Sequence, residues 1–221
     1  LLEGGHDIPI GYIPAGTTND FAATVGLPLT ISEAVRGIIG GTPTPIDIGS
    51  FGRDAYFSYI ASFGAFTKTS YSTPQPMKNA LGHLAYLLEG AKEVTSIEEI
   101  PMRILSGCTE YCGKFIFGAI SNSTSVGGIL KYPTESVGLS DGIFEAMFIR
   151  RPENLIELSE VLRCIKAHDF TNKNILFFHT DSLELTCAGD GVTAWTTDGE
   201  YAGERHSVVI TNLHKAIKII K

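Results

Sequence analysis

The sequence PAGTTNDFA, at residues 14–22, says more about this chain than any other stretch. It lies between an apolar run at residues 8–13 and a short helix-like segment that ends at Gly26. Its proline and glycine predict a turn where backbone N–H groups, hydroxyls and a carboxylate meet, which suits phosphate or metal–phosphate binding. Farther along, TDGE at residues 197–200 offers two more acids beside a tight turn. Together the two stretches indicate a nucleotide-using enzyme.

Composition sets broader limits on the class of protein. The 221 residues are 43% apolar, which is ordinary for a globular chain, and no apolar run approaches the roughly 20 residues of a membrane span. A net charge of −7 argues against a nucleic-acid partner, and no basic cluster is present to hold an anionic bilayer. The four cysteines are sparse. Cys108 and Cys112 have no second pair to complete a metal site, so we interpret all four as reduced thiols of a cytosolic protein.

Apolar residues at helical spacing predict four helices. The first covers residues 20–25, with Asp20 as its N-cap and Gly26 as its end. A capping box from Thr30 to Glu33 begins the second, which ends at the glycine pair after residue 39. The third and fourth cover residues 78–94 and 153–168.

Strand candidates are more numerous and follow Gly-rich turns. A hairpin is predicted at residues 52–54, and Trp195 is expected in the core. The strands are predicted at residues 47–51, 55–62, 102–105, 114–121, 143–149, 175–179, 183–188, 194–197 and 208–211. This density predicts an α+β, mostly β fold: a sandwich-like or barrel-like β domain with added helices.

The ends of the chain predict a second, partial domain. Residues 1–5 read as the last turn of a helix with a glycine C-cap, and the apolar run after them reads as the last strand of an α/β domain. We therefore expect residues 1–20 to be the remnant of an α/β nucleotide-binding domain and residues 21–214 to form the β-rich domain. Residues 215–221 are expected to pack back on the first domain.

Seven short pieces, in order, resemble the bacterial lipid kinases of the diacylglycerol kinase and sphingosine kinase superfamily, whose fold is related to that of the NAD kinases. Each piece alone is weak, whereas the ordered set is specific. The pieces are PAGTTNDFA, Ile46-Asp47-Ile48 with Tyr56-Phe57, Ser62-Phe63-Gly64, Gly82-x-x-Ala85-Tyr86, Ser121-Asn122-Ser123 with Gly127-Gly128, Asp141-Gly142 and Asp198-Gly199-Glu200. The resemblance covers essentially the whole chain and implies the NAD kinase/diacylglycerol kinase-like fold.

The resemblance also implies a missing part. Members of that family carry a Gly-Gly-Asp-Gly-Thr loop that cradles the nucleotide phosphates, and this sequence does not contain one. The chain would then hold the C-terminal β-rich domain plus the last strand of the nucleotide domain. On its own we expect it to be inactive.

The resemblance assigns the catalytic roles to the second acidic stretch. Glu200 matches the proposed catalytic acid of the family and is our candidate general base for a lipid hydroxyl. Asp198 would lie on the same side of an extended strand and bind or orient Mg²⁺. The plainer alternative is a hairpin turn followed by a solvated glutamate.

The first stretch takes the nucleotide side of the same site. Asn19 and Asp20 match positions that complete the nucleotide and Mg²⁺ network in the family, and Gly16 and Thr17 would let the backbone approach the nucleotide. The alternative reading of these four residues is a capped helix start.

A second metal position is predicted more weakly. Some family members bind a structural Mg²⁺ at an Asp-Asp-Gly turn through carboxylate and main-chain oxygens. Here Ser140 replaces one of the two acids, which leaves Asp141 and the main chain of Ile143 as the candidate ligands, with Glu135 or Glu145 nearby in the sequence.

Taken together, these residues predict part of an ATP-dependent lipid kinase with ATP and Mg²⁺ as its cofactors, acting on diacylglycerol or a related lipid at the membrane surface. We expect a cytoplasmic protein with transient membrane association, no nucleic-acid partner and a possible homodimer. Two alternatives stay open: an NAD kinase-like small-molecule kinase, and a non-catalytic β-rich binding module.

Overall fold

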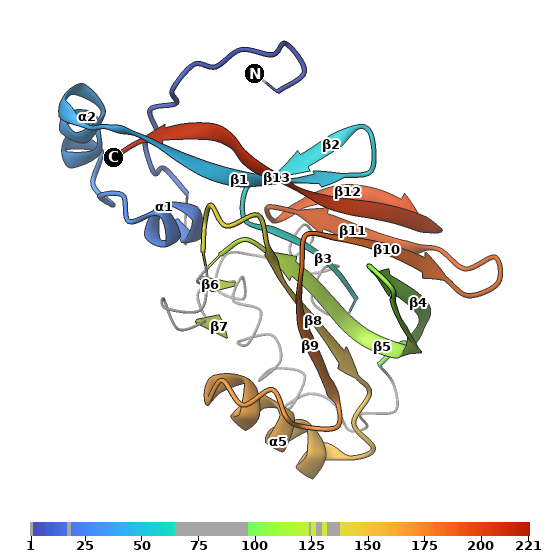
Figure 1. The fold of residues 1–221 in the computed structure, drawn as a ribbon. Helices are drawn as coiled ribbons and strands as arrows, with labels where there is room; N and C mark the ends of the chain where they lie inside the picture. The colour runs from blue at the N-terminus through green and yellow to red at the C-terminus, as the bar shows by residue number, and fades with distance from the viewer. Residues whose placement is uncertain (1, 17–18, 65–96, 124, 127–129, 132–137) are drawn as a thin grey trace.

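The computed structural model describes residues 2–16, 19–64, 97–123, 125–126, 130–131 and 138–221, and it is mostly β. Within these residues one curled sheet of 11 strands carries almost the whole architecture. Its strand order is β12-β11-β3-β5-β4-β10-β13-β1-β2, and β8 joins it by pairing with β5 and with β9 (Figure 1). The predicted α+β, mostly β fold class is confirmed.

The strands have the following bounds: β1 Pro43–Phe51, β2 Ala55–Phe57, β3 Ile60–Gly64, β4 Ile100–Ser106, β5 Thr109–Ser121, β6 Ser125–Val126, β7 Leu130–Lys131, β8 Phe144–Arg150, β9 Ile175–Thr180, β10 Ser182–Cys187, β11 Thr193–Thr197, β12 Glu200–Arg205 and β13 Ser207–Ile220. All the ladder pairs are antiparallel, and β6 and β7 form a separate two-stranded ribbon. The predicted hairpin at residues 52–54 joins β1 to β2, with Phe51 opposite Ala55.

The described helices are α1 Asp20–Val25, α2 Ile31–Gly40 and α5 Leu155–Lys166. The N-cap of α1 is Asn19 rather than the predicted Asp20, because Asn19 takes the left-handed conformation (φ 50°, ψ 35°) that starts the helix one residue earlier. The predicted helix at residues 78–94 lies outside the described residues. None of the described helices is long and apolar enough to cross a membrane.

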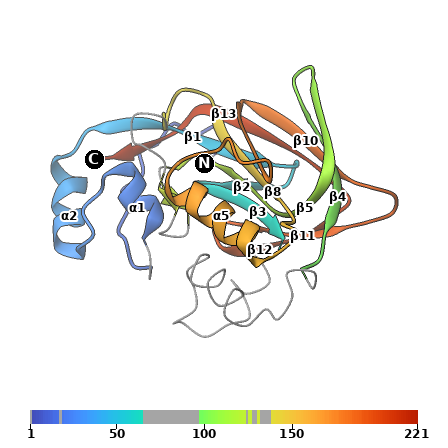
Figure 2. The ribbon, with the colours of Figure 1, turned by 90° about the horizontal axis from the view of Figure 1, so that it is seen from below.

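Apolar side chains form three clusters. The largest lies inside the curl of the sheet and contains Trp195, which is 1% exposed and packs against Phe51 and Phe63 at centroid distances of 5.3 and 4.9 Å. A second cluster fills the space between the outer face of the sheet and α5 (Figure 2). The third, smaller cluster joins α1 to β1 and β13, through Phe21, Ala22, Val25, Leu27, Ile46 and Ile219.

Two strand predictions need correction. The run at residues 55–62 is not continuous: it divides into β2 and β3 because the N–H groups of Ser58, Tyr59 and Ile60 bond to the Asp198 carboxylate. Strand β12 was not predicted, since residues 200–205 are mostly polar and exposed at the sheet edge.

The last strand is longer than predicted and includes the tail. β13 runs through Ile220 and pairs with β1 from Ile210 to Ile220, and Ile219 also forms a parallel bridge with Ile10. Among the described residues, Ile10 is the one position of the predicted strand at residues 8–13 that pairs with another strand, and it does so through this isolated bridge. The proposed division at residues 20 and 214 stays a prediction.

Candidate functional site

The acidic turn between β11 and β12 faces the connection between β2 and β3. Asp198 has a left-handed backbone (φ 51°), and Gly199 follows it with φ 86°, so the chain reverses within two residues. The Asp198 carboxylate accepts N–H bonds from Ser58 at 2.6 Å, Tyr59 at 3.0 Å and Ile60 at 3.2 Å. Three backbone donors fix the orientation of this carboxylate.

Burial and hydrogen bonding act in opposite directions on Asp198. Its desolvation raises the pKa above the ordinary aspartate value, while the three backbone N–H bonds lower it. The net direction is upward. A cation beside this carboxylate would favour its ionised form.

Glu200 begins β12 beyond the turn, and its side chain is exposed. It is two residues from Asp198 and opposite Thr197 in the β11–β12 ladder. An exposed carboxylate at this point is open to a substrate that approaches from solvent, whereas the Asp198 carboxylate beside it is held in place.

The first stretch supplies Asp20, which is 7% exposed in the first turn of α1. The Asn19 side chain accepts the N–H of Gly16 at 2.9 Å and so closes the turn that precedes the helix. Thr17 lies outside the described residues. The structure thus describes three of the four predicted nucleotide-binding positions, and they lie within one turn.

Tyr59 connects the two stretches. Burial is the main cause that raises the pKa of its phenol, followed by the negative charges of Asp198 and Asp20, then by Tyr12 and Glu200. The main-chain N–H of Tyr59 donates to Asp198 Oδ1, and its side chain packs against the apolar cluster that contains Phe21 of α1. Tyr59 therefore lies between the acidic turn and the start of α1.

A second polar network lies behind this site and centres on Asp47. Asp47 lies in β1 at the point where the register with β13 shifts, between Ile46 opposite Ile217 and Ile48 opposite Leu213, and it is fully buried. Its carboxylate accepts the N–H of Gly142 at 2.6 Å, the N–H of Lys215 at 2.6 Å and a bond with His214 Nδ1 at 3.1 Å.

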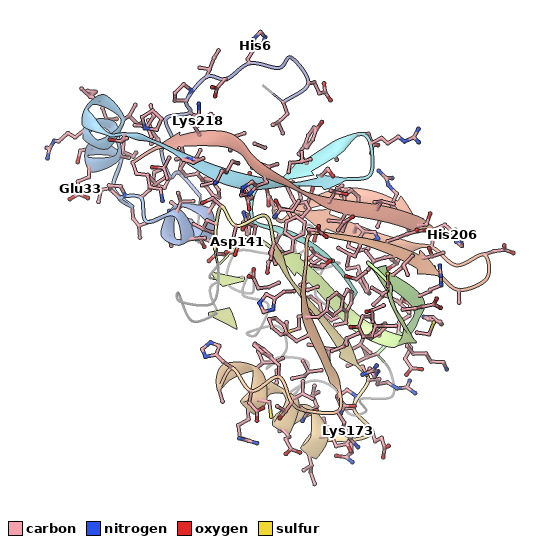
Figure 3. All side chains as sticks on the ribbon, viewed as in Figure 1. His6, Glu33, Asp141, Lys173, His206 and Lys218 are labelled. Atoms are coloured by element: carbon pink, nitrogen blue, oxygen red, sulfur yellow. The ribbon has the colours of Figure 1, made fainter. Side chains whose placement is uncertain are left out.

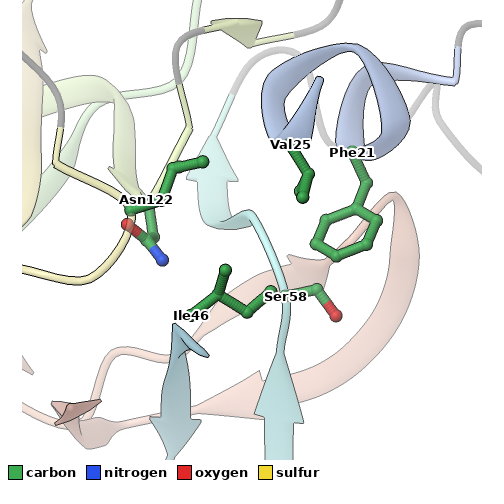
Figure 4. Close-up of a pocket in the computed structure, with 6 residues that line it drawn as sticks. Phe21, Val25, Ile46, Ser58 and Asn122 are labelled. Atoms are coloured by element: carbon green, nitrogen blue, oxygen red, sulfur yellow. The ribbon is translucent and has the colours of Figure 1, made fainter. Parts of the chain in front are cut away.

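Asn122 joins the two networks. Its side-chain amide donates to the Asp47 carbonyl at 3.0 Å, and its backbone N–H donates to the Tyr59 carbonyl at 3.0 Å. Beside it Ser123 shares a hydroxyl–hydroxyl bond of 2.7 Å with Thr24 of α1. Figure 4 shows Asn122 and the α1 side chains Phe21 and Val25 around the small hollow between them, which is also lined by Ile46, Ser58 and Leu139.

The predicted second metal position is separate from this site. Asp141 is exposed, and its Oδ1 accepts the N–H of Ile143 at 3.0 Å (Figure 3). Its charge helps to raise the pKa of Glu145 to about 8, although the main cause is the burial of Glu145. The Glu145 Oε2 atom is buried with no hydrogen-bond partner. Across the described part of the chain no group of three or more acids, histidines or cysteines is placed to hold a metal ion. The turn thus offers two acids and main-chain oxygens, and Glu135 lies outside the described residues.

Comparison with known proteins identifies the family of this chain. Residues 1–51 match the model of the diacylglycerol kinase catalytic domain. The diacylglycerol kinase of Bacillus subtilis (strain 168) is 32% identical over 218 residues, which are 96% of this chain and 68% of the relative. The chain belongs to the diacylglycerol kinase family.

Further members of this family align over the same span. The diacylglycerol kinase of Staphylococcus epidermidis (strain RP62A) is 28% identical over 220 residues, covering 99% of this chain and 68% of the relative. Two solved structures from Bacillus anthracis str. Sterne, the second described as a diacylglycerol kinase, each cover 94% of the chain with TM-scores of 0.74 and 0.65, at 22% and 19% identity. These structures confirm the fold. The chain spans about two thirds of the length of its relatives, since it covers 68% of the B. subtilis kinase.

Sequence reasoning missed Tyr59 and the joining role of Asn122, and it named Glu145 only as an acid near the Asp141 turn. Asp47 and Asn122 stood inside pieces quoted for the resemblance, but their part in the site depends on strand pairing. Tyr59 gave no local signal because an aromatic residue between two strands reads as core.

Proposed function

We propose that this chain is part of an ATP-dependent lipid kinase that transfers the γ-phosphate of ATP to the hydroxyl of diacylglycerol or a related lipid. The observation that supports it most is that the connection between β2 and β3 contacts both the Asp198 carboxylate and the apolar cluster of α1, the helix that begins at Asp20, in a chain of the diacylglycerol kinase family. The named relatives are kinases of diacylglycerol, which favours a lipid alcohol over NAD as the acceptor.

In the proposed reaction Glu200 takes the proton of the lipid hydroxyl. The hydroxyl oxygen forms a bond to the γ-phosphorus, the bond from that phosphorus to the bridging oxygen breaks, and ADP leaves with the electron pair. The exposed carboxylate of Glu200 is suited to this because it can meet an acceptor at the surface, and a positioned base contributes about 10²–10⁴-fold.

Asp20 and Asp198 fit the needs of a nucleotide-bound Mg²⁺. That ion is bound in enzymes by one or two carboxylates together with substrate phosphates, so a larger protein cluster is not required. Asp20 is buried and Asp198 is half-buried, and the raised pKa of Asp198 indicates a carboxylate that a cation would stabilise. Bound Mg²⁺ would offset the charge that develops on the transferred phosphate. The chain's own contribution is to hold Asp198 still through three N–H bonds.

The decisive experiment measures lipid phosphorylation by the complete gene product. A panel of diacylglycerol, a phosphatidylglycerol-type lipid, a sphingoid base and a polyprenol would be incubated with ATP, with Mg²⁺ present and then chelated. We expect one labelled lipid product that disappears on chelation. Phosphorylation of NAD, or no transfer to any lipid, would overturn the proposed function.

Glu200→Gln tests the base separately. We expect turnover to fall at least about 10²-fold while the protein stays folded, because the amide cannot accept the proton. Glu204→Gln is the matched control, since Glu204 is another exposed glutamate of β12. Near-normal turnover in Glu200→Gln would remove Glu200 from the mechanism.

A further inference from the structure

The paired strands β1 and β13 join the two halves of the candidate site. Residues 48–51 of β1 pair with residues 210–213, in the part of the sheet that β2 and β10 continue. Residues 43–46 pair with residues 217–220, and there Ile46 and Ile219 pack against α1. Figure 1 shows β1 and β13 running together from the sheet to the side on which α1 lies. The position of α1 relative to the sheet therefore depends on the point where these two stretches meet.

Asp47 lies at that point. Between the two stretches β1 has this single residue, whereas β13 has residues 214–216, so the extra residues of β13 open the ladder. Lys215 takes a left-handed backbone there, with φ 52°. The buried Asp47 carboxylate fills the opening, where it accepts the N–H of Lys215 at 2.6 Å and bonds with His214 Nδ1 at 3.1 Å. One side chain thus replaces the interrupted ladder.

The other polar groups of Asp47 bind three further segments. Its Oδ2 accepts the Gly142 N–H at 2.6 Å, and its own N–H donates to the Leu139 carbonyl at 2.8 Å. Its carbonyl accepts the side-chain amide of Asn122 at 3.0 Å. A buried polar network in which each of these groups is paired holds its members in one arrangement.

The segment at Asn122 contacts both halves of the site. The Asn122 N–H donates to the Tyr59 carbonyl at 3.0 Å, and the Tyr59 N–H donates to Asp198 Oδ1 at 3.0 Å. On the other side, the Ser123 hydroxyl bonds with the Thr24 hydroxyl of α1 at 2.7 Å. The residue that Asp47 holds is therefore linked to the acidic turn and adjoins a residue that is linked to α1.

We propose that Asp47 is a positioning residue, which sets the separation between the α1 half of the site and the Asp198–Glu200 turn. Phosphoryl transfer requires the phosphate donor and the lipid hydroxyl to meet in one geometry, and a displacement of about 1 Å can lower a rate about 10²-fold. This inference rests on the proposed function, since Asp47 acts on the reaction only through the acids of the two halves.

The kinetic test is Asp47→Asn in the complete gene product. The substitution keeps the shape of the side chain but places an NH₂ group against an N–H donor, so a carboxylate bond is lost. We expect kcat to fall about 10-fold or more while KM for the lipid stays within about two-fold, because the sheet half alone would hold the lipid. Asp181→Asn is the matched control, since Asp181 is an exposed aspartate between β9 and β10, and both constants should stay unchanged.

Lys215→Gly separates positioning from stability. Glycine adopts the left-handed backbone of residue 215 without steric cost, so in the Asp47→Asn background it should restore stability without restoring the lost acceptor. We expect urea unfolding to show the gain in stability while kcat stays low. Recovery of kcat in step with stability would overturn the proposal.

Asn122→Leu tests the same link with the Asp47 carboxylate intact. Leucine has a similar volume and removes the amide bond to the Asp47 carbonyl, and the amide oxygen of Asn122 has no hydrogen-bond partner among the described residues. We expect a fall in kcat like that of Asp47→Asn. An unchanged kcat in a folded Asn122→Leu protein would contradict the link from Asp47 to the acidic turn.

A distance measurement tests the positioning directly and needs no turnover. Nitroxide labels are attached to cysteines introduced by Ala23→Cys and Glu204→Cys, at exposed positions of α1 and β12, with the exposed Cys108 and Cys112 replaced by serine. Double electron–electron resonance should give one narrow distance distribution in the parent and in the control, and a shifted or broader one in Asp47→Asn. The same distribution in all three proteins would overturn the proposal.

Failure of the inference and failure of the proposed function give different results. An unmodified protein that phosphorylates no lipid overturns the proposed function itself. An active protein whose Asp47→Asn variant keeps its kcat or its label distance overturns only the role of Asp47.

Discussion

Two Asp-Gly turns in this chain have the same two residues, but their aspartate side chains point in opposite directions, one to solvent and one into the protein. In both, the glycine has a positive φ, 82° at Gly142 and 86° at Gly199. At the first turn Asp141 faces solvent, and the Gly142 N–H donates inward to the buried Asp47. At the second, Asp198 itself turns inward and collects three N–H groups from another strand connection.

The difference lies in the partner strand rather than in the dipeptide. At its register shift with β13, strand β1 carries its own buried carboxylate, Asp47, which accepts the Gly142 N–H in place of Asp141. Between β2 and the start of β3, the N–H groups of Ser58, Tyr59 and Ile60 point toward the acidic turn, and no nearby residue of that segment is an acid. Asp198 supplies the acceptor for all three. An Asp-Gly pair therefore predicts a turn, and its tertiary contacts decide whether the aspartate is structural, catalytic or simply solvated.

The largest expected effect is on the Asp47 side of this comparison. Asp47→Ala leaves the N–H groups of Gly142 and Lys215 and the His214 ring without their buried acceptor. We expect it to lower the free energy of unfolding by about 3 kcal/mol or more, because each unsatisfied buried donor costs about 1–3 kcal/mol. Urea unfolding measures the change.

Asp54→Ala is its control. That aspartate is exposed, and its one ion pair, to Arg205 at 3.4 Å, should be worth less than about 1 kcal/mol. Equal destabilisation by the two substitutions would contradict a special role for Asp47.

A pH-dependent effect of intermediate size is expected at Glu145, the buried acid near the first turn. Its pKa is raised to about 8, so between the unfolded value near 4.5 and about 8 the unfolded state ionises while the folded state stays protonated. Its contribution to stability is therefore complete below pH 4.5 and is lost as the pH rises to about 8.

Glu145→Gln removes this titration. The variant should match the parent near pH 4.5 and exceed it in stability by about 4 kcal/mol near pH 8, measured by chemical unfolding across that range. A stability difference between parent and variant that does not change with pH would show that Glu145 has a partner in the folded protein.

The two turns themselves are compared by Asp198→Asn and Asp141→Asn. An asparagine at 198 keeps one acceptor oxygen but turns an NH₂ toward one of the three N–H donors, so we expect a loss of about 1–2 kcal/mol. At 141 the remaining oxygen still accepts the Ile143 N–H, and a change within about 0.5 kcal/mol is expected. Thermal unfolding of both variants decides the point, and a larger loss at 141 would reverse the assignment of the two turns.

The smallest effect concerns Mg²⁺ at Asp141 and Ile143, which stays a prediction. If the ion binds there, Mg²⁺ at a concentration equal to its Kd should stabilise the parent by about 0.4 kcal/mol and Asp141→Asn by less. The unfolding free energy is titrated with MgCl₂ in the absence of nucleotide, so that a nucleotide-bound ion does not contribute. An equal response of both proteins would remove the metal from this turn.

Most helices and strands could be predicted from the sequence because they depend on the local spacing of apolar residues and on the positions of glycine turns. The segments that became α1, α2 and α5 carry apolar residues at helical spacing, and most strands stand between glycine turns. The division of residues 55–62 into β2 and β3 was not predictable, since it depends on a carboxylate 138 residues away from Ile60. Strand β12 was missed because its polar residues lie at a sheet edge.

The sequence was enough to predict the acidic residues of the candidate site, but not the residues that contact and position them. Asp20, Asp198 and Glu200 stand in recognisable stretches, so their types and order were enough to name them. Tyr59 and Asn122 acquire their roles only when strand pairing brings β3 beside β11 and β5. Glu145 reads as an ordinary strand glutamate until the burial of its strand is known.

The sheet can close only after strand β13, the last of the described strands in sequence order, has been synthesised. This strand lies between β10 and β1, and its pairing places Ile220 opposite Pro43. Until residues 207–220 are available, β1 has no neighbour on that edge, and β10 has only β4 beside it. Closing the sheet joins segments from distant parts of the sequence, which is the kind of topology that folds slowly. Until β13 is in place, the exposed edges of β1 and β10 can pair with a strand of another molecule, so this is the stage of folding at which aggregation is most favoured.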